Sequence, residues 1–160
     1  MAKLLISFIP WAVYWAFAVP CQYKLGGFLA VSIAIFLNLR HANNPKLLEV
    51  VTTPFFFIAM LIFNYADLEL HLSFVWLAGV ALIPLALGKV TFIQQYFAEE
   101  GVPPLRKYNL LSALWGGVFL ATAVGSWYGN YLIPAGLAIL AAVFSALYGK
   151  RAGMVENAEG

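Results

Sequence analysis

The chain has 160 residues, of which 63% are hydrophobic and 10% are charged, and its formal net charge at pH 7 is +2. Soluble domains are about 45–50% apolar and about 25% charged, so this surplus of apolar side chains predicts that lipid is the solvent. The composition offers no clustered basic surface for nucleic acid, and the single cysteine, Cys21, excludes an internal disulfide and a cysteine-based metal cage.

Six apolar stretches are predicted to be transmembrane helices of one integral membrane domain that covers residues 1–160. In chain order they are Leu4–Val19, Leu25–Leu39, Val50–Ala66, Leu72–Leu87, Leu110–Tyr128 and Tyr131–Tyr148. The expected fold class is therefore all-α, a polytopic bundle of five to six membrane-spanning helices. Most stretches are shorter than the roughly 20 residues that usually cross a bilayer, so flanking residues or a thinner bilayer must supply the rest.

The first stretch allows three interpretations. Met1–Lys3 before the apolar run and Ala16–Ala18 after it are typical of a signal peptide with its cleavage site. Pro10 permits a shallow or re-entrant segment that is interrupted at this residue. The aromatic residues Tyr14 and Trp15 crowd the cleavage site and favour an uncleaved span. N-terminal sequencing of the purified protein distinguishes cleavage from the other two.

The nine Lys and Arg residues alternate between the connections. If all six stretches cross the bilayer, Lys24 lies alone on one side, and the other eight lie on the opposite side. Basic residues in short loops are retained in the cytoplasm, so the pattern places both termini on the cytoplasmic side.

Ionisable residues are absent from the interiors of the predicted spans. His41 and Glu49 fall in the connection Arg40–Glu49, and His71 falls in the connection Asp67–His71. Charged groups at membrane depth usually mark ion paths or proton relays, so their absence argues against a proton-coupled pump. Neutral Ser and Thr side chains are expected to bond to their own helix or to a neighbouring one.

The segment Lys89–Gly101, before the fifth span, is predicted to form an amphipathic interfacial helix. One face of this helix carries Val90, Phe92, Ile93, Tyr96 and Phe97, and the other carries Thr91, Gln94, Gln95 and Ala98. Such a helix is suited to the headgroup layer, where Arg106 and Lys107 would meet anionic lipid. The segment is either an anchor or a docking surface for a partner, and its candidate residues are Lys89, Phe92, Ile93, Gln94, Tyr96, Phe97, Arg106, Lys107 and Asn109.

The fifth span carries small residues at every fourth position, which places them on one helix face: Gly117, Ala121, Gly125 and Gly129. The sixth span has a similar file, Ala138, Ala142 and Ala146. Small residues let helices approach closely in lipid, so the two spans are expected to pack against each other. A homodimer face is the alternative.

No catalytic, cofactor or metal site is expected from the sequence. His41 and His71 are predicted on opposite membrane faces, and Asp67 and Glu69 in a solvated turn. The sequence contains no HExxH, P-loop or G-x-S-x-G motif.

Three local patterns resemble one bacterial family. Phe8-Ile9-Pro10 opens an aromatic apolar run, Phe92-Ile93-Gln94 follows the basic Lys89, and Lys107-Tyr108-Asn109 precedes Trp115 and Phe119. With the span layout, these residues make the chain similar to the YciB, or intracellular septation protein A, family of bacterial inner-membrane proteins. The resemblance implies a multi-pass inner-membrane protein with a non-enzymatic role in envelope maintenance and septation, acting through other envelope or division proteins.

Two other functions remain open from the sequence. One is a small-solute transporter or channel with a path near Asn64, Pro84 and Thr122, where Pro84 would kink the fourth span beside a cavity. The other is a membrane enzyme that uses His41 or His71.

Overall fold

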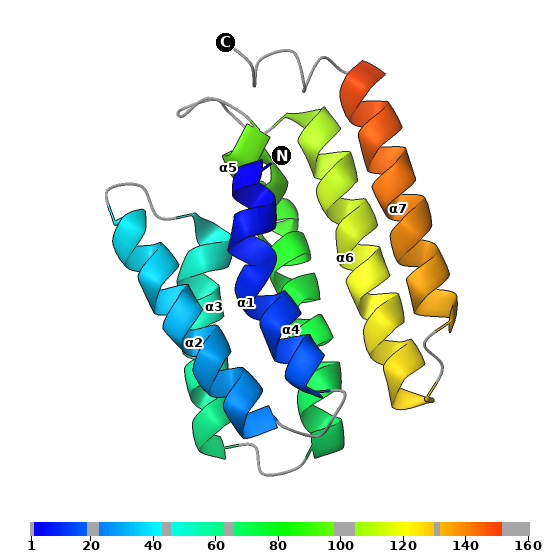
Figure 1. Ribbon diagram of the computed structural model, residues 1–160. Helices are drawn as coiled ribbons and strands as arrows, with labels where there is room; N and C mark the ends of the chain where they lie inside the picture. Colours follow the sequence, from blue (N-terminus) through cyan, green and yellow to red (C-terminus); the bar gives the residue numbers. More distant parts are fainter. Residues whose placement is uncertain are drawn as a thin grey trace. The chain divides into compact units, whose positions relative to one another are not determined.

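The computed structural model describes residues 2–18, 23–42, 46–62, 66–97, 105–129 and 132–151, and these residues form seven α-helices and no strand. The all-α class is thus confirmed. The helices are α1 (Ala2–Ala18), α2 (Tyr23–Arg40), α3 (Leu47–Ile62), α4 (Ala66–Ala86), α5 (Phe92–Phe97), α6 (Arg106–Trp127) and α7 (Leu132–Arg151) (Figure 1).

The chain divides into two compact units, Met1–Leu72 and Ser73–Gly160, and the boundary lies within α4. In the first unit α1, α2 and α3 run alternately up and down, with α2 packed against both of its neighbours. α1 and α2 approach each other closely at Gly26, because a Cβ at this position would lie 2.7 Å from the Cβ of Phe17.

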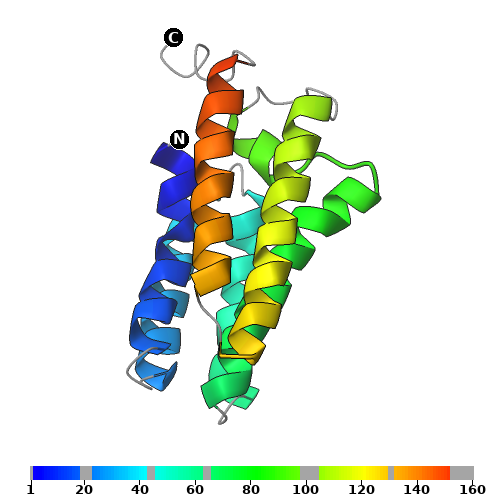
Figure 2. The same ribbon diagram turned by 90° about the vertical axis from the view of Figure 1, so that its right-hand side faces the viewer.

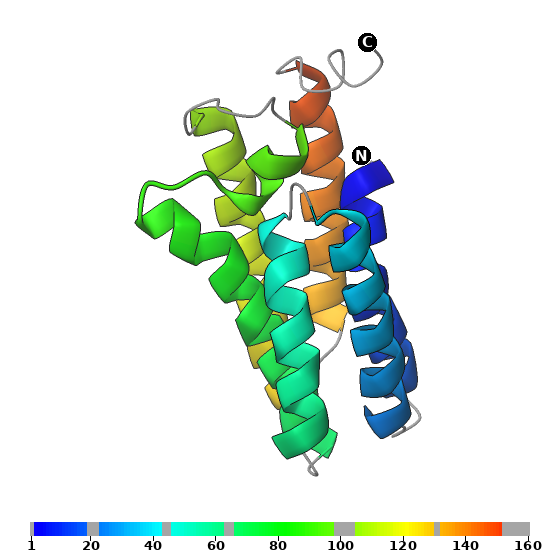
Figure 3. The same cartoon turned by 90° about the vertical axis from the view of Figure 1, so that its left-hand side faces the viewer.

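In the second unit, α6 and α7 lie side by side (Figure 2). An extended segment leads from the end of α4 to the short helix α5, which packs against α6 (Figure 3). Gly88 and Gly129 follow the ends of α4 and α6 with φ angles of 62° and 69°. Glycine is favoured there because this left-handed backbone carries a steric penalty for residues with a Cβ.

The observed helices correct several predicted boundaries. α3 begins at Leu47, so Glu49 lies in its first turn and not in a connection. α4 begins at Ala66, so His71 is helical as well. α1 is continuous through Pro10, so the one of the three interpretations that interrupts the segment at this residue does not agree with the structure.

Among the described residues, one helix, α6, is both long and apolar enough to cross a membrane. Shorter apolar helical stretches cover Ile6–Phe17, Leu47–Leu61, His71–Ala86 and Gly136–Ser145.

Candidate functional site

A buried polar cluster lies in the first unit, where the first half of α1 meets the end of α2 and the start of α3. The Ser7 hydroxyl donates to Oε1 of Glu49 at 2.6 Å. Nδ1 of His41 lies 3.1 Å from both carboxylate oxygens of Glu49. The Glu49 side chain is 1% exposed and that of His41 is 35% exposed. The carboxylate is therefore enclosed by the protein, and the imidazole reaches the surface.

Local helix chemistry explains how the sequence positions this pair. Glu49 sits in the first turn of α3, where the free N–H groups of a helix stabilise a negative charge. His41 continues the last turn of α2, because its backbone N–H donates to the Leu37 carbonyl at 3.0 Å. The end of α2 and the start of α3 thus bring the two side chains together although they are eight positions apart in the chain.

Asn38 joins the ends of α2 and α3. Its Nδ2 lies 2.9 Å from the main-chain oxygen of Glu49 and 2.8 Å from Oγ1 of Thr53, and it also lies 3.0 Å from the Ala34 carbonyl of its own helix. These contacts fix the start of α3 relative to α2, and so they hold Glu49 in place.

Aromatic packing joins α1 to α3 next to the cluster. Trp11 is fully buried and donates its indole N–H to Oγ1 of Thr52 at 2.9 Å. Its ring centroid lies 5.0 Å from that of Phe55 and 4.8 Å from that of Phe56. Tyr14 adds a contact of 5.0 Å to Phe56. The polar cluster therefore lies next to a tightly packed aromatic layer between α1 and α3.

The chemistry of the cluster depends on which group accepts the hydrogen bond from the Ser7 hydroxyl. Ser7 donates to Glu49 and not to His41, so the imidazole is not placed as a base for the serine hydroxyl. Ser7 is also 1% exposed. The arrangement is a carboxylate held by a hydroxyl and an imidazole, and it does not place the serine for nucleophilic attack.

The predicted interfacial segment has a different structure from the expected one. Phe92, Ile93 and Gln94 are 2%, 4% and 1% exposed, and Thr91 is fully buried. The prediction of one apolar and one polar face is wrong here, because residues of both faces are enclosed within the protein. Lys89 is exposed, whereas Tyr96 and Phe97 are half-buried.

Hydrogen bonds explain why the polar residues of this segment can be buried. Oε1 of Gln94 accepts from the backbone N–H of Leu105 at 2.9 Å, and the Tyr108 hydroxyl donates to the Phe97 carbonyl at 3.2 Å. These bonds hold α5 against the start of α6. Phe92, Ile93 and Gln94 are thus internal contacts, and no surface for a partner is left at these three positions.

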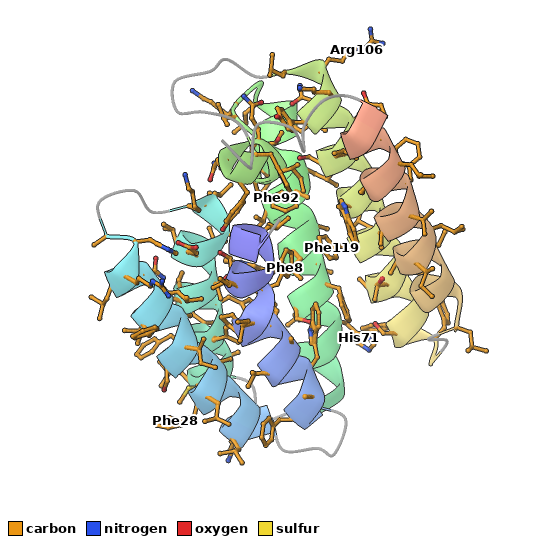
Figure 4. The ribbon with its side chains drawn as sticks, turned by 45° about the horizontal axis from the view of Figure 1, so that its top comes forward. Phe8, Phe28, His71, Phe92, Arg106 and Phe119 are labelled. Carbon is orange, nitrogen blue, oxygen red and sulfur yellow. The ribbon has the colours of Figure 1, made fainter. Side chains whose placement is uncertain are left out.

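The remaining predicted residues of this segment lie in the first turn of α6. Arg106 is exposed, and its side chain points away from the helix (Figure 4). Lys107 is half-buried, with Nζ 5.2 Å from the centroid of the Tyr108 ring. Asn109 is half-buried, and its Oδ1 has no hydrogen-bond partner among the described residues. Among the candidate residues of this segment, the exposed basic side chains are therefore those of Lys89 and Arg106.

The small-residue ladder of α6 does not form one packed face. Gly117 is exposed, and a Cβ at this position would have no described atom within 4 Å. The same is true of Gly129, which follows the end of the helix. Ala121 and Gly125 are half-buried. The close contact is made instead by Gly116, where a Cβ would lie 2.5 Å from Cγ of Leu82 in α4.

α6 and α7 are joined by a side-chain hydrogen bond, in which the Trp115 indole N–H donates to the Ser145 hydroxyl at 3.1 Å. On α7, Ala141 is buried, whereas Ala142 is exposed. The helices are thus neighbours as expected. The prediction that Gly117 and Ala142 lie in the contact between them is wrong, because both residues are exposed.

The other candidate residues do not assemble into a site. The Thr122 hydroxyl donates to the Val118 carbonyl of its own helix at 2.8 Å. Pro84 is buried within α4, and Asn64 lies outside the described residues. Within the described part of the chain, no three His, Cys, Asp or Glu side chains are placed to hold a metal ion.

Comparison with family models, with curated proteins and with solved structures finds no match to this chain.

Proposed function

We propose that the chain is a polytopic membrane protein in which the six long helices α1–α4, α6 and α7 cross the bilayer. The observation that carries the proposal is the exposure of large apolar side chains on every long helix. Within the described part of the chain, the buried polar and charged residues are Ser7, Glu49, Thr52, Ser73, Thr91, Gln94, Ser112 and Ser126. Large apolar side chains are exposed on every long helix, among them Ile9, Phe28, Phe36, Leu61, Ile83, Val124 and Leu140.

Water would oppose this distribution, whereas lipid favours it. Phe28 and Phe36 of α2 are 55% and 62% exposed, and Leu61 of α3 is 70% exposed. Apolar area in water costs about 25 cal/mol per Å², so the exposure of these large side chains to water would be unfavourable. A hydrocarbon environment removes this cost and requires the polar groups to pair inside, as Ser7 and Glu49 do.

Within the membrane, the proposed role is non-enzymatic. The protein acts in bacterial envelope maintenance and septation through contacts with other envelope or division proteins, and its C-terminus is cytoplasmic. The resemblance to the intracellular septation protein A family supports this role. Exposed Lys89 and Arg106 favour a partner with an acidic surface, since Phe92, Ile93 and Gln94 are buried.

Deletion in the native host with imaging of cell length and septa tests the role. Wild-type chain should restore normal division. The double variant Lys89→Glu and Arg106→Glu should be present at normal levels but fail to restore it, and it should no longer co-purify with envelope proteins in mild detergent. Arg40→Glu, an exposed basic residue of the first unit, is the matched control. Unaltered division in the deletion strain contradicts the role.

A small-solute transporter or channel is the second candidate. The specific observation in its favour is the carboxylate of Glu49, which is buried among helices proposed to lie in the membrane, next to the half-buried His41. Flux in proteoliposomes tests it. Transport that Glu49→Gln abolishes supports this candidate, and equal flux in vesicles with and without the protein rejects it.

A further inference from the structure

The end of α2 and the start of α3 carry two basic residues that the proposed envelope role does not use. Arg40, the last residue of α2, is exposed, and Lys46, just before α3, is half-buried. Neither side chain has an ion-pair partner within the part of the chain that the structure describes. Glu49, the acidic residue of this segment, is enclosed and contacts Ser7 and His41 instead. Arg40 and Lys46 are therefore available to an anionic group from outside the protein.

Internal contacts hold these two basic residues at one end of the first unit. Nδ2 of Asn38 lies 2.9 Å from the main-chain oxygen of Glu49, and Nδ1 of His41 lies 3.1 Å from its carboxylate. These contacts join the end of α2 to the start of α3, and the two helices lie side by side (Figure 1). Arg40 directly precedes His41, and Lys46 is three positions before Glu49. Both basic residues thus flank the same junction.

Exposed apolar side chains lie within one helical turn of these basic residues. On α2, the exposed Phe36 is four positions before Arg40, which places both on one helix face. Leu39, next to Arg40, is exposed as well. On α3, the exposed Val50 donates its backbone N–H to the Lys46 carbonyl at 3.0 Å. Each helix thus has an exposed apolar side chain one turn from a basic residue.

We propose that this end of the first unit binds an anionic phospholipid, with the phosphate at Arg40 and Lys46 and an acyl chain along Phe36 and Val50. The planar guanidinium of Arg matches the geometry of a phosphate, and Lys supplies a second basic group. A phospholipid fits because its charged headgroup and its acyl chains are adjacent, as are the basic and apolar residues here. A soluble acidic protein would match the basic residues but not the apolar side chains beside them.

This inference rests on the proposed placement of α2 and α3 in the bilayer, but it does not depend on the envelope role. At the end of a membrane-spanning helix, basic residues lie at the level of the lipid headgroups. Each Lys or Arg at this level is expected to strengthen the binding of anionic lipid by about fivefold. Lys24, an exposed basic residue near the opposite end of α2, is the matched control for position.

Photocrosslinking of the full-length protein in vesicles of dioleoyl phosphatidylcholine tests the lipid site. The vesicles contain a trace of one photoreactive probe, either anionic phosphatidylglycerol or zwitterionic phosphatidylcholine, with the same diazirine in the acyl chain. Mass spectrometry locates the crosslinks, and the headgroup preference is the ratio of crosslinking by the anionic probe to that by the zwitterionic probe. Leu61, exposed near the opposite end of α3, is the reference position for lipid contact.

The wild-type protein should show a headgroup preference at Phe36 and Val50 of about fivefold for each basic residue, and no preference at Leu61.

Three variants assign the preference to particular residues. Arg40→Gln and Lys46→Gln should each reduce the headgroup preference at the lipid site about fivefold, and the double variant should abolish it. Lys24→Gln should leave the preference unchanged. Crosslinking of Leu61 at the wild-type level shows that a variant is still folded in the membrane.

The outcomes separate the lipid site from the membrane placement on which it rests. Crosslinks at Phe36, Val50 and Leu61 without headgroup preference overturn the lipid site alone, and so does a preference that survives in the double variant. A preference that excess inorganic phosphate removes at constant ionic strength overturns the lipid as occupant and indicates a free phosphate. If neither probe crosslinks to any of the three positions, the membrane placement is wrong, and the lipid site fails with it.

Discussion

Replacement of Ser7 by Ala removes one of the two donors to the enclosed carboxylate. The bond is 2.6 Å long, both partners are buried, and the acceptor is a carboxylate. A hydrogen bond to a charged group contributes about 1.5–3 kcal/mol, and the exchange leaves only a small void because the hydroxyl alone is lost. We therefore expect Ser7→Ala to lower the free energy of unfolding by about 2 kcal/mol.

The assay is denaturant unfolding of the full-length protein in mild detergent, followed by circular dichroism. Ser32→Ala is the matched control, because the Ser32 hydroxyl is exposed and donates to the Phe28 carbonyl of its own helix. This control should change the free energy of unfolding by less than about 0.5 kcal/mol. If the two variants have the same stability within error, Glu49 does not depend on Ser7 and the reasoning about the cluster is refuted.

Two further predictions concern the second unit. Gly116→Ala should be about 1–3 kcal/mol less stable than Gly117→Ala in thermal denaturation, because only the first places a methyl group against Leu82 and both gain the same helix propensity. Equal stability would contradict the close approach of α4 and α6. Gln94→Ala leaves the N–H of Leu105 without its side-chain acceptor, and the same measurement should give a loss of about 1–3 kcal/mol. A change below about 0.5 kcal/mol would mean that this bond does not hold α5 in place.

The positions of the long helices could be predicted from hydropathy, because an apolar run without charge has few alternatives to a helix. The predicted stretch Leu25–Leu39 and the observed α2, Tyr23–Arg40, differ by two residues or fewer at each end. Larger errors arose where the first turn of a helix contains a charged residue. Glu49 was assigned to the connection Arg40–Glu49, although the observed helix α3 begins at Leu47.

The polar cluster could not be predicted because its partners are distant in the chain. Ser7 and Glu49 are 42 residues apart, and a carboxylate is expected in water until its buried donors are known. A signal was present in the polar residues at the adjoining helix ends, Asn38, His41 and Glu49, which three-helix packing brings together. The helical wheel similarly failed for Gln94, since a six-residue helix can be enclosed on both faces when Leu105 supplies a donor.

The central claim, that six helices cross the bilayer, is tested most directly by reporter fusions to the chain. Alkaline phosphatase is active only outside the cytoplasm, and green fluorescent protein fluoresces only inside it. Fusions after Arg40 and at Gly160 should fluoresce and lack phosphatase activity, and a fusion after Gly129 should show the reverse. Reporters after Arg40 and Gly129 on the same side of the membrane would contradict the proposed topology.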